Sequence, residues 1–273
     1  MKPILSTAGI EFRIALRNRW VAIATGLMVL FALVLAAAGA APTGDIGADR
    51  LSVTVVSLTS LAVYLVPLLA LLISFDAIAG EVERGTLPLL LTYPVSRSGI
   101  LAGKLLAHLL ILAIAVSLGY GAAALTALWA DAGAMTGMAA LIRLIWTSVL
   151  LGATFLGLGY ALSSLARRPS GAAGLAIGLW LALVVLYDLG LLALVVSGAD
   201  GGPATRSLPG LLLANPADSF RLFNLAAAEA GGAAGGMGGA AASIPLWQSA
   251  LSLMLWPLVA LALALAAFRK VTP

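Results

Sequence analysis

The residues of this sequence best suited to chemistry lie between positions 76 and 104. Charged side chains here separate two long apolar runs, namely Asp76, Glu81, Glu83, Arg84, Arg97 and Lys104. Charged groups in this position need water or a protein partner to complete their charge-assisted hydrogen bonds. Glycines and prolines break the stretch into short pieces, as expected of a connector between helices. We therefore expect this connector to bind a separate soluble protein.

The connector also imitates a phosphate-binding loop. A P-loop has four residues between its first glycine and a Gly-Lys pair, and Ser or Thr follows the lysine. Here only three residues separate Gly99 from Gly103 and Lys104, and Leu105 comes next. The sequence therefore predicts a chain that is not itself an enzyme. Any ATP and Mg would be bound by a partner ATPase.

Candidates for catalysis or metal binding are few, because the chain has no cysteine and one histidine, His108. This composition excludes disulfides, thiolate metal sites and a multi-histidine site within one subunit. An intramembrane hydrolase would pair a nucleophile with a base, and Ser163 or Ser164 with His108 is the available combination. Thioethers suit Cu(I), and the predicted outer loops carry three methionines that are candidate ligands, Met135, Met138 and Met237.

One aspartate, Asp188, falls inside an apolar run. A central Asp costs about 2.5–3.5 kcal/mol in a membrane helix, so such residues usually face the bundle or a wet cavity. Two interpretations stay open: a conduit or gating residue, or an outer-end residue that is hydrated or bonded to Tyr187 or a neighbouring helix. In the same run, Gly174 and Gly178 let backbones approach closely. They predict a packing seam within the subunit or between two subunits.

The composition places these residues in a membrane protein. Of the 273 residues, 62% are hydrophobic and 10% charged, against about 25% charged in soluble domains. Residues 1–20 predict an amphipathic interfacial helix with Trp20 at headgroup level. Residues 21–273 predict an all-α, six-span transmembrane domain, with spans at approximately 21–41, 53–75, 105–129, 141–165, 172–196 and 247–268. The first run exceeds the roughly 7–15 apolar residues of a signal peptide, so we interpret it as a span.

The distribution of positive charge predicts the orientation. Six spans place both termini on one side, which holds eleven of the 15 Lys and Arg residues: Lys2, Arg13, Arg17, Arg19, Arg84, Arg97, Lys104, Arg167, Arg168, Arg269 and Lys270. The other side holds Arg50, Arg143, Arg206 and Arg221. The positive-inside rule therefore makes the termini and connector 76–104 cytoplasmic and residues 197–246 periplasmic. Within that outer segment, Asn215 followed by Pro216 predicts the start of a short helix.

The order of residues in the connector closely resembles the signature of ABC-2-type transporter permeases. The resemblance is carried by Glu81, Glu83, Arg84, Gly85, Thr86, Leu90, Pro94 and Arg97. It implies a type V exporter-like fold in which these residues belong to a cytoplasmic coupling helix, seated in a cleft of the nucleotide-binding subunit. The amphipathic start, the six spans and the external helix before the last span fit the same family.

Within that family, the chain length and the run Gly-Glu-Val-Glu-Arg-Gly-Thr-Leu-Pro resemble the permeases that serve nitrous-oxide reductase maturation in denitrification. This narrower resemblance implies an inner-membrane homodimer with two ATPase subunits, and with its first, second and fifth spans at the seam. It also implies a periplasmic copper-handling β-helix protein on the outer loops. Assembly of copper sites would involve a moved sulfur species or relayed force. An exporter of lipids, drugs or other small molecules and a secondary transporter remain the alternatives; the latter would need several intramembrane acids.

Overall fold

The computed structural model describes residues 2–38, 50–92, 95–130, 135, 137–197, 203–230 and 244–271. These residues form helices and turns, with no strand among them. In chain order the helical segments are α1 (Lys2–Leu16), α2 (Arg19–Ala38), α3 (Arg50–Ser74), α4 (Ala79–Glu83), α5 (Thr86–Thr92), α6 (Arg97–Ala130), α7 (Met138–Leu165), α8 (Pro169–Trp180), the π-helical turn η2 (Leu181–Leu186), α9 (Tyr187–Ser197), α10 (Pro203–Ala214), α11 (Pro216–Ala230) and α12 (Leu246–Arg269).

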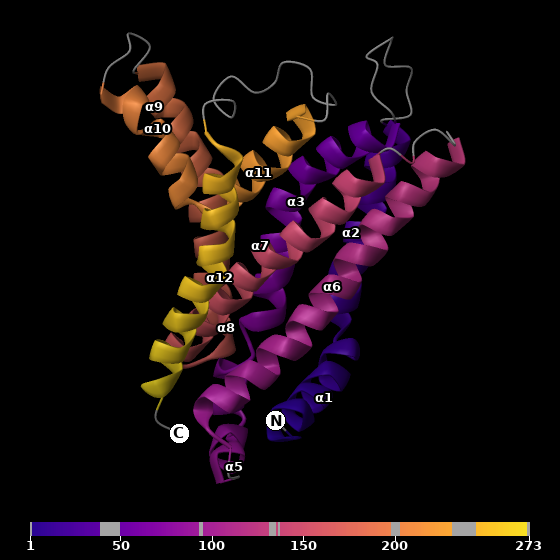
Figure 1. The fold of residues 1–273 in the computed structure, drawn as a ribbon. Coiled ribbons are helices and arrows are strands. Elements are labelled where there is room, and N and C mark those ends of the chain that lie inside the picture. The colour runs from indigo at the N-terminus through magenta and orange to yellow at the C-terminus, as the bar shows by residue number, and fades with distance from the viewer. Residues whose placement is uncertain are drawn as a thin grey trace.

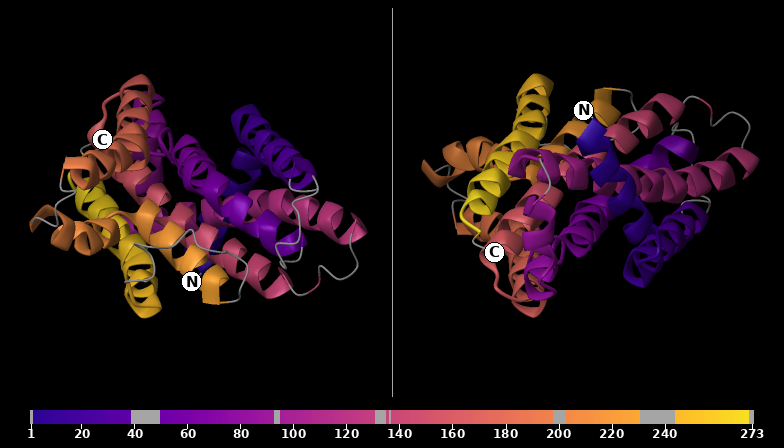
Figure 2. Two further views of the ribbon diagram at one scale, coloured as in Figure 1. Left: turned by 90° about the horizontal axis from the view of Figure 1, so that it is seen from above. Right: turned by 90° about the horizontal axis from the view of Figure 1, so that it is seen from below.

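The helices form an elongated bundle with two distinct ends (Figure 1). Both termini lie at one end, together with α1 and α5, and we call this the terminal end. The helices α9, α10 and α11 lie at the other end, which we call the opposite end. Seen along its long axis, the bundle carries α2 and α12 on opposite flanks (Figure 2).

Six stretches of the described residues are long and apolar enough to cross a membrane. They are Arg19–Ala37, Arg50–Glu83, Arg97–Ala130, Met138–Leu165, Pro169–Val196 and Leu246–Arg269. The helix α1 precedes them, and α11 lies before the last of them. The predicted all-α polytopic architecture, with a helix before the first span and another before the last, is therefore confirmed.

Small residues on α7 let three other helices pack tightly against it. A Cβ on Gly157 would lie 2.8 Å from the Cβ of Ala260 on α12, which is closer than real side chains approach. A Cβ on Gly152 would overlap a leucine side chain of α6, and one on Gly159 would overlap a serine of α3. Because a packed core has few voids, these glycines place α7 at the centre of the bundle.

The fifth apolar stretch is interrupted by the π-helical turn η2. Such turns are rare and often occur at functional positions. The side chain of Asn215, from the start of α11, donates to the carbonyl oxygen of Leu183 at 2.7 Å. Just before the turn, the indole nitrogen of Trp180 donates to the carbonyl oxygen of Tyr64 on α3 at 3.0 Å. These two bonds anchor the irregular part of the stretch to its neighbours.

Two segments differ from the sequence-based expectation. Helix α6 begins at Arg97, so residues 97–104 of the expected connector are already helical. Ser96 explains this start, because its hydroxyl accepts from the backbone N–H of Gly99 at 3.1 Å, as an N-cap residue does. In the outer segment, helix α11 begins at Pro216 as expected, and α10 is an additional helix that the sequence did not predict.

Candidate functional site

The connector folds as two short helices, α4 and α5, joined at Gly85. A helix as short as α4 leaves most of its first backbone N–H groups without an internal acceptor. Ser163 of α7 supplies one, since its hydroxyl oxygen accepts from the N–H groups of Ile78 and Ala79 at 3.0 and 2.9 Å. Gly85 has a positive φ of 67°, the left-handed conformation that ends many helices. The α4–α5 turn is thus fixed by its own backbone and by α7.

The structure divides the residues of the predicted coupling set into two groups. Glu83, Arg84, Gly85 and Thr86 are exposed at the turn between α4 and α5. Glu81 points the other way and is 8% exposed. Leu90 is half-buried and Arg97 is partly buried, while Pro94 lies outside the described residues. Among the described members of the set, Glu83, Arg84 and Thr86 have exposed side chains at this turn.

Lys104 is the centre of a buried ion cluster at the terminal end. Its Nζ donates to Oε1 of Glu81 at 2.6 Å and also to Oε1 of Glu11. Lys104 itself is 2% exposed. The three residues come from α6, α4 and α1. An ammonium this far from water is stable only with such partners, so the cluster joins the amphipathic helix and the connector to the third span.

A second set of polar contacts continues from this cluster into α7. Nε2 of His108 lies 3.9 Å from Oε2 of Glu11, and its Nδ1 is 2.7 Å from the hydroxyl oxygen of Tyr160. The hydroxyl of Ser164 donates to the backbone oxygen of Tyr160 at 2.8 Å. Ser163 is engaged by α4. These bonds do not join either serine to His108, so the geometry does not support the hydrolase alternative.

Arg97 connects the start of α6 to the end of α12. Its Nη1 donates to the backbone oxygens of Phe268 and Val271 at 2.9 and 2.7 Å, and to that of Arg269 at 3.3 Å. The guanidinium also lies 5.8 Å from the centre of the Phe268 ring. A cation at a helix C-terminus stabilises the exposed carbonyl groups there. Arg97 therefore holds two helices together.

The opposite end has its own ion cluster, centred on Arg221 of α11. Its Nη2 donates to Oδ2 of Asp188 at 2.8 Å, and its Nη1 to Oδ1 of Asp218 at 3.3 Å. Asp188, predicted as a conduit or gating residue, thus has a partner on a neighbouring helix. Asp218 is 1% exposed. Burial raises the pKa of its carboxyl to about 7, and the nearby Asp188 carboxylate adds to this effect.

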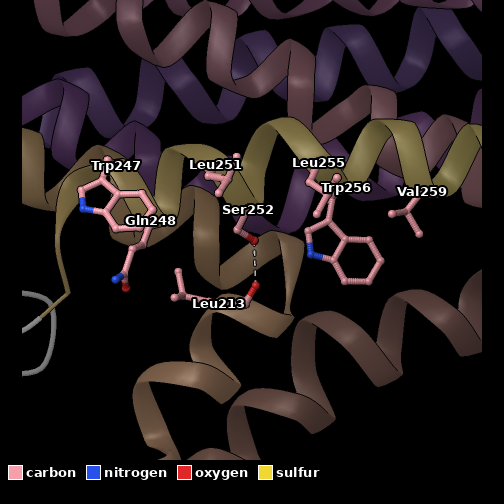
Figure 3. A pocket seen from close by; sticks show the side chains of 8 residues that line it. All are labelled: Leu213, Trp247, Gln248, Leu251, Ser252, Leu255, Trp256 and Val259. Carbon is pink, nitrogen blue, oxygen red and sulfur yellow. Dashed lines mark hydrogen bonds between the residues drawn. The ribbon is translucent and has the colours of Figure 1, made fainter.

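An open groove of about 470 Å³ lies beside this end, between α10 and α12 (Figure 3). Apolar side chains form most of its wall, including Trp247 and Trp256. The hydroxyl of Ser252 donates to the backbone oxygen of Leu213 at 2.7 Å, and Ser219 of α11 shares a 2.8 Å hydrogen bond with it. Ser252 therefore ties α10 and α11 to the last span.

The remaining predicted residues lie apart from both clusters. A Cβ on Gly174 or Gly178 would meet no described atom within 4 Å, so the structure shows no seam within the subunit at these glycines. Met135 is exposed, Met138 packs beside the core, and Met237 lies outside the described residues. Among the described residues, no group of three or more His, Cys, Asp or Glu could hold a metal ion.

Sequence reasoning placed Lys104 in the connector without its partners, and it did not assign Glu11 or Tyr160 to the site. Lys104 stands next to a long apolar run, and a charge so placed needs an opposite charge nearby. Glu11 supplies one from an otherwise basic and apolar N-terminal helix. Residue type therefore indicated the pairing of Lys104 with an acid. The partnership of Tyr160 with His108 was not predictable, because a buried tyrosine hydroxyl usually has a partner but the sequence does not show which residue it is.

Comparison with known proteins supports the family resemblance that was inferred from the connector. The family described as "ABC-2 family transporter protein" matches residues 5–271. The chain is 47% identical over 274 residues to a "Probable ABC transporter permease protein NosY" of Pseudomonas aeruginosa. It is 44% identical over 277 residues to a protein of the same name from Stutzerimonas stutzeri. Each alignment covers 99% of both chains. The resemblance to ABC-2-type permeases is therefore confirmed, and the chain belongs to the ABC-2 family of transporter proteins.

Proposed function

We propose that this chain is the membrane-spanning permease of an ABC transporter that serves assembly of the copper sites of nitrous-oxide reductase. It works in the bacterial inner membrane with both termini cytoplasmic. The observation that carries the proposal is the full-length similarity to two NosY proteins, at 47% and 44% identity. The similarity extends over 99% of this chain and 99% of each relative.

The exposed turn between α4 and α5 is the surface for the ATPase. It presents the opposite charges of Glu83 and Arg84 side by side, with the exposed Leu89 on the following helix. A soluble partner can pair both charges and cover the leucine. ATP and Mg are bound by two copies of that partner, and this chain binds no cofactor and catalyses no reaction.

Movement of the turn reaches the bundle through polar contacts. Glu81 faces inward from α4 and bonds Lys104 of α6, which also bonds Glu11 of α1. Ser163 links the same short helix to α7. A push on Glu83 and its neighbours is therefore delivered to three helices at once. An ordinary solvated loop would not need such contacts.

The remaining partners are a second copy of the chain and a periplasmic protein. The outward glycines Gly174 and Gly178 suit a seam between two copies, formed by the first, second and fifth spans. Helix α10, which has exposed residues at the opposite end, offers the surface for a copper-handling β-helix protein. We assign the copper to that partner.

Charge reversal at the turn tests the ATPase surface. We expect Glu83→Lys to abolish co-purification of an ABC ATPase with this chain in mild detergent, because it places a second cation beside Arg84. Arg168→Glu is the matched control, since it reverses an exposed charge outside the connector. Retention of the ATPase by Glu83→Lys, or its loss from both variants, would contradict the proposed surface.

The maturation role is tested in a denitrifying host that lacks this chain. We expect nitrous-oxide reductase from such cells to be short of copper, and the wild-type chain to restore it. If the reductase has its full copper content in cells that lack this chain, the proposed maturation role is wrong. The ATPase result would then point to an exporter of other cargo.

A further inference from the structure

A cavity of about 440 Å³ opens at the terminal end of the bundle. It lies between four parts of the fold: the bend between α1 and α2, the end of α3, the helix α4 and the start of α6. Its charged wall consists of Glu11, Asp76, Glu81, Arg84 and Lys104, and the polar Asn18 and His108 line it as well. The proposed function uses the outer surface of α4 and leaves this cavity without a role.

Two carboxylate oxygens in this wall lack a donor. Oδ1 of Asp76 and Oε2 of Glu81 are buried and have no hydrogen-bond partner among the described residues. Glu81 is 8% exposed, so bulk water reaches it poorly. Buried polar atoms are nearly always paired. The cavity therefore calls for a ligand that donates hydrogen bonds.

The charge of the wall indicates a cationic ligand. Its three carboxylates face two cations, Arg84 and Lys104. Both cations are already engaged: Lys104 is shared between Glu11 and Glu81, and Nη1 of Arg84 lies 3.4 Å from Oδ2 of Asp76, whose other oxygen stays without a donor. His108 is bonded to the hydroxyl of Tyr160. A primary ammonium group offers three N–H donors and fits the excess negative charge.

A second, apolar groove of about 290 Å³ adjoins this cavity. The two share Trp20, Leu72 and Phe75 as lining residues. The groove continues between α3 and α8, where Ala173 and Ala176 form its wall. A polar cavity that continues into an apolar groove suits an amphiphilic ligand, whose charged head would lie in the cavity and whose hydrocarbon tail would lie in the groove. Trp20 lies at their junction, as tryptophans do at membrane interfaces.

We propose that these two spaces hold one phospholipid with a primary-amine headgroup, taken from the leaflet at the terminal end. The ammonium donates to Asp76 and Glu81, and the phosphate faces the exposed guanidinium of Arg84. An acyl chain fills the groove beside Ala173. The lipid thereby bridges α3, α4 and α8. This binding is independent of any ATPase.

Lipid binding is measured by native mass spectrometry of the purified chain in detergent. The probes are phosphatidylethanolamine and phosphatidylcholine with identical acyl chains. Both carry a phosphate and a positive nitrogen, but only the ethanolamine has N–H donors. We expect the wild type to retain phosphatidylethanolamine about tenfold better, as charge-assisted hydrogen bonds predict. Equal retention of the two lipids, or retention of neither, would overturn the proposal.

Variants locate the site. Asp76→Asn should remove most of the preference for ethanolamine, and Ala173→Phe should block retention by filling the groove. Leu175→Phe is the control, since it adds a ring on the exposed face of the same helix. Unchanged retention by Ala173→Phe would place the lipid elsewhere. If the monomer retains the lipid and the dimer does not, the groove is covered by a second copy of the chain in the dimer, and the proposal is wrong for the assembled protein. If Asp76→Asn fails to fold, the proposal is still tested by comparing the two lipids on the wild type and by comparing Ala173→Phe with Leu175→Phe.

Discussion

The two ends of the bundle each hold one cation between two carboxylates, but they are built differently. At the terminal end, Lys104 is 2% exposed and its partners come from two other helices, α1 and α4. At the opposite end, the side chain of Arg221 is 31% exposed. One of its partners, Asp218, lies three residues away on the same helix.

The cluster at the terminal end is a buried structural connection, whereas the partly exposed cluster at the opposite end can be adjusted by its surroundings. Removing a buried cation leaves two carboxylates without compensation and separates three helices. Removing Asp188, whose side chain is 28% exposed, affects a pair that water already reaches. The terminal cluster is therefore suited to transmit force, and the opposite cluster to respond to its surroundings.

The largest effect is expected from Lys104→Met. The substitution leaves Glu11 and Glu81 as unpaired buried charges, which should lower the free energy of unfolding by about 3–5 kcal/mol. Thermal unfolding of the detergent-solubilised chain measures this change. Lys270→Met, which removes an exposed lysine near the C-terminus, should have little effect.

The ionic origin of that loss can be checked separately. Adding Glu11→Gln and Glu81→Gln to Lys104→Met removes both unpaired charges and should recover part of the lost stability. If Lys104→Met unfolds at the temperature of Lys270→Met, the buried cluster does not hold the terminal end together.

The next effect concerns pH and belongs to the opposite end. Burial and the neighbouring Asp188 raise the pKa of Asp218 to about 7, above about 3.9 in an unfolded chain. The folded state then binds a proton more tightly, so its contribution to stability is complete below about pH 4 and is lost as the pH rises through 7. Thermal unfolding of the wild type should therefore shift to lower temperature between pH 5 and 8.

The matched variant is Asp218→Asn, whose side chain stays neutral throughout this range. Its unfolding temperature should change less between pH 5 and 8 than that of the wild type. Parallel profiles for the two proteins would show that Asp218 titrates in its ordinary range and that the opposite end is not adjustable in this way.

A smaller effect is expected from Gly80→Ala at the terminal end. The added Cβ would overlap the carboxylate of Asp76 and lie 2.8 Å from Nη1 of Arg84. Overpacking of this kind costs about 1–3 kcal/mol, and the lower value applies here because both side chains can move. Gly174→Ala is the control, since its Cβ meets open space. Equal unfolding temperatures for the two variants would show that Gly80 is not constrained.

The architecture was predictable from the sequence, and the internal contacts were only partly so. Long apolar runs require helices in a membrane, and the pattern of Asn215 and Pro216 marked the start of α11 correctly. By contrast, Glu81 and Glu83 look equivalent in the sequence, yet one is buried and the other exposed. Their difference depends on Lys104, a residue far along the chain, and on the rotation of a five-residue helix. Local patterns do not encode such long-range pairings.

The smallest effect is expected from Asp188→Asn, and it tests whether the opposite end does more than stabilise. Arg221 keeps Asp218 as a partner, and the broken pair is partly exposed. Stability should therefore fall by about 1 kcal/mol or less. The informative measurement is ATP hydrolysis by the complete transporter. Asp188 lies two residues after the end of the π-helical turn η2, so a gating role would change the coupled rate far more than the stability. An unchanged coupled rate would leave Asp188 as an outer-end residue held by a neighbouring helix.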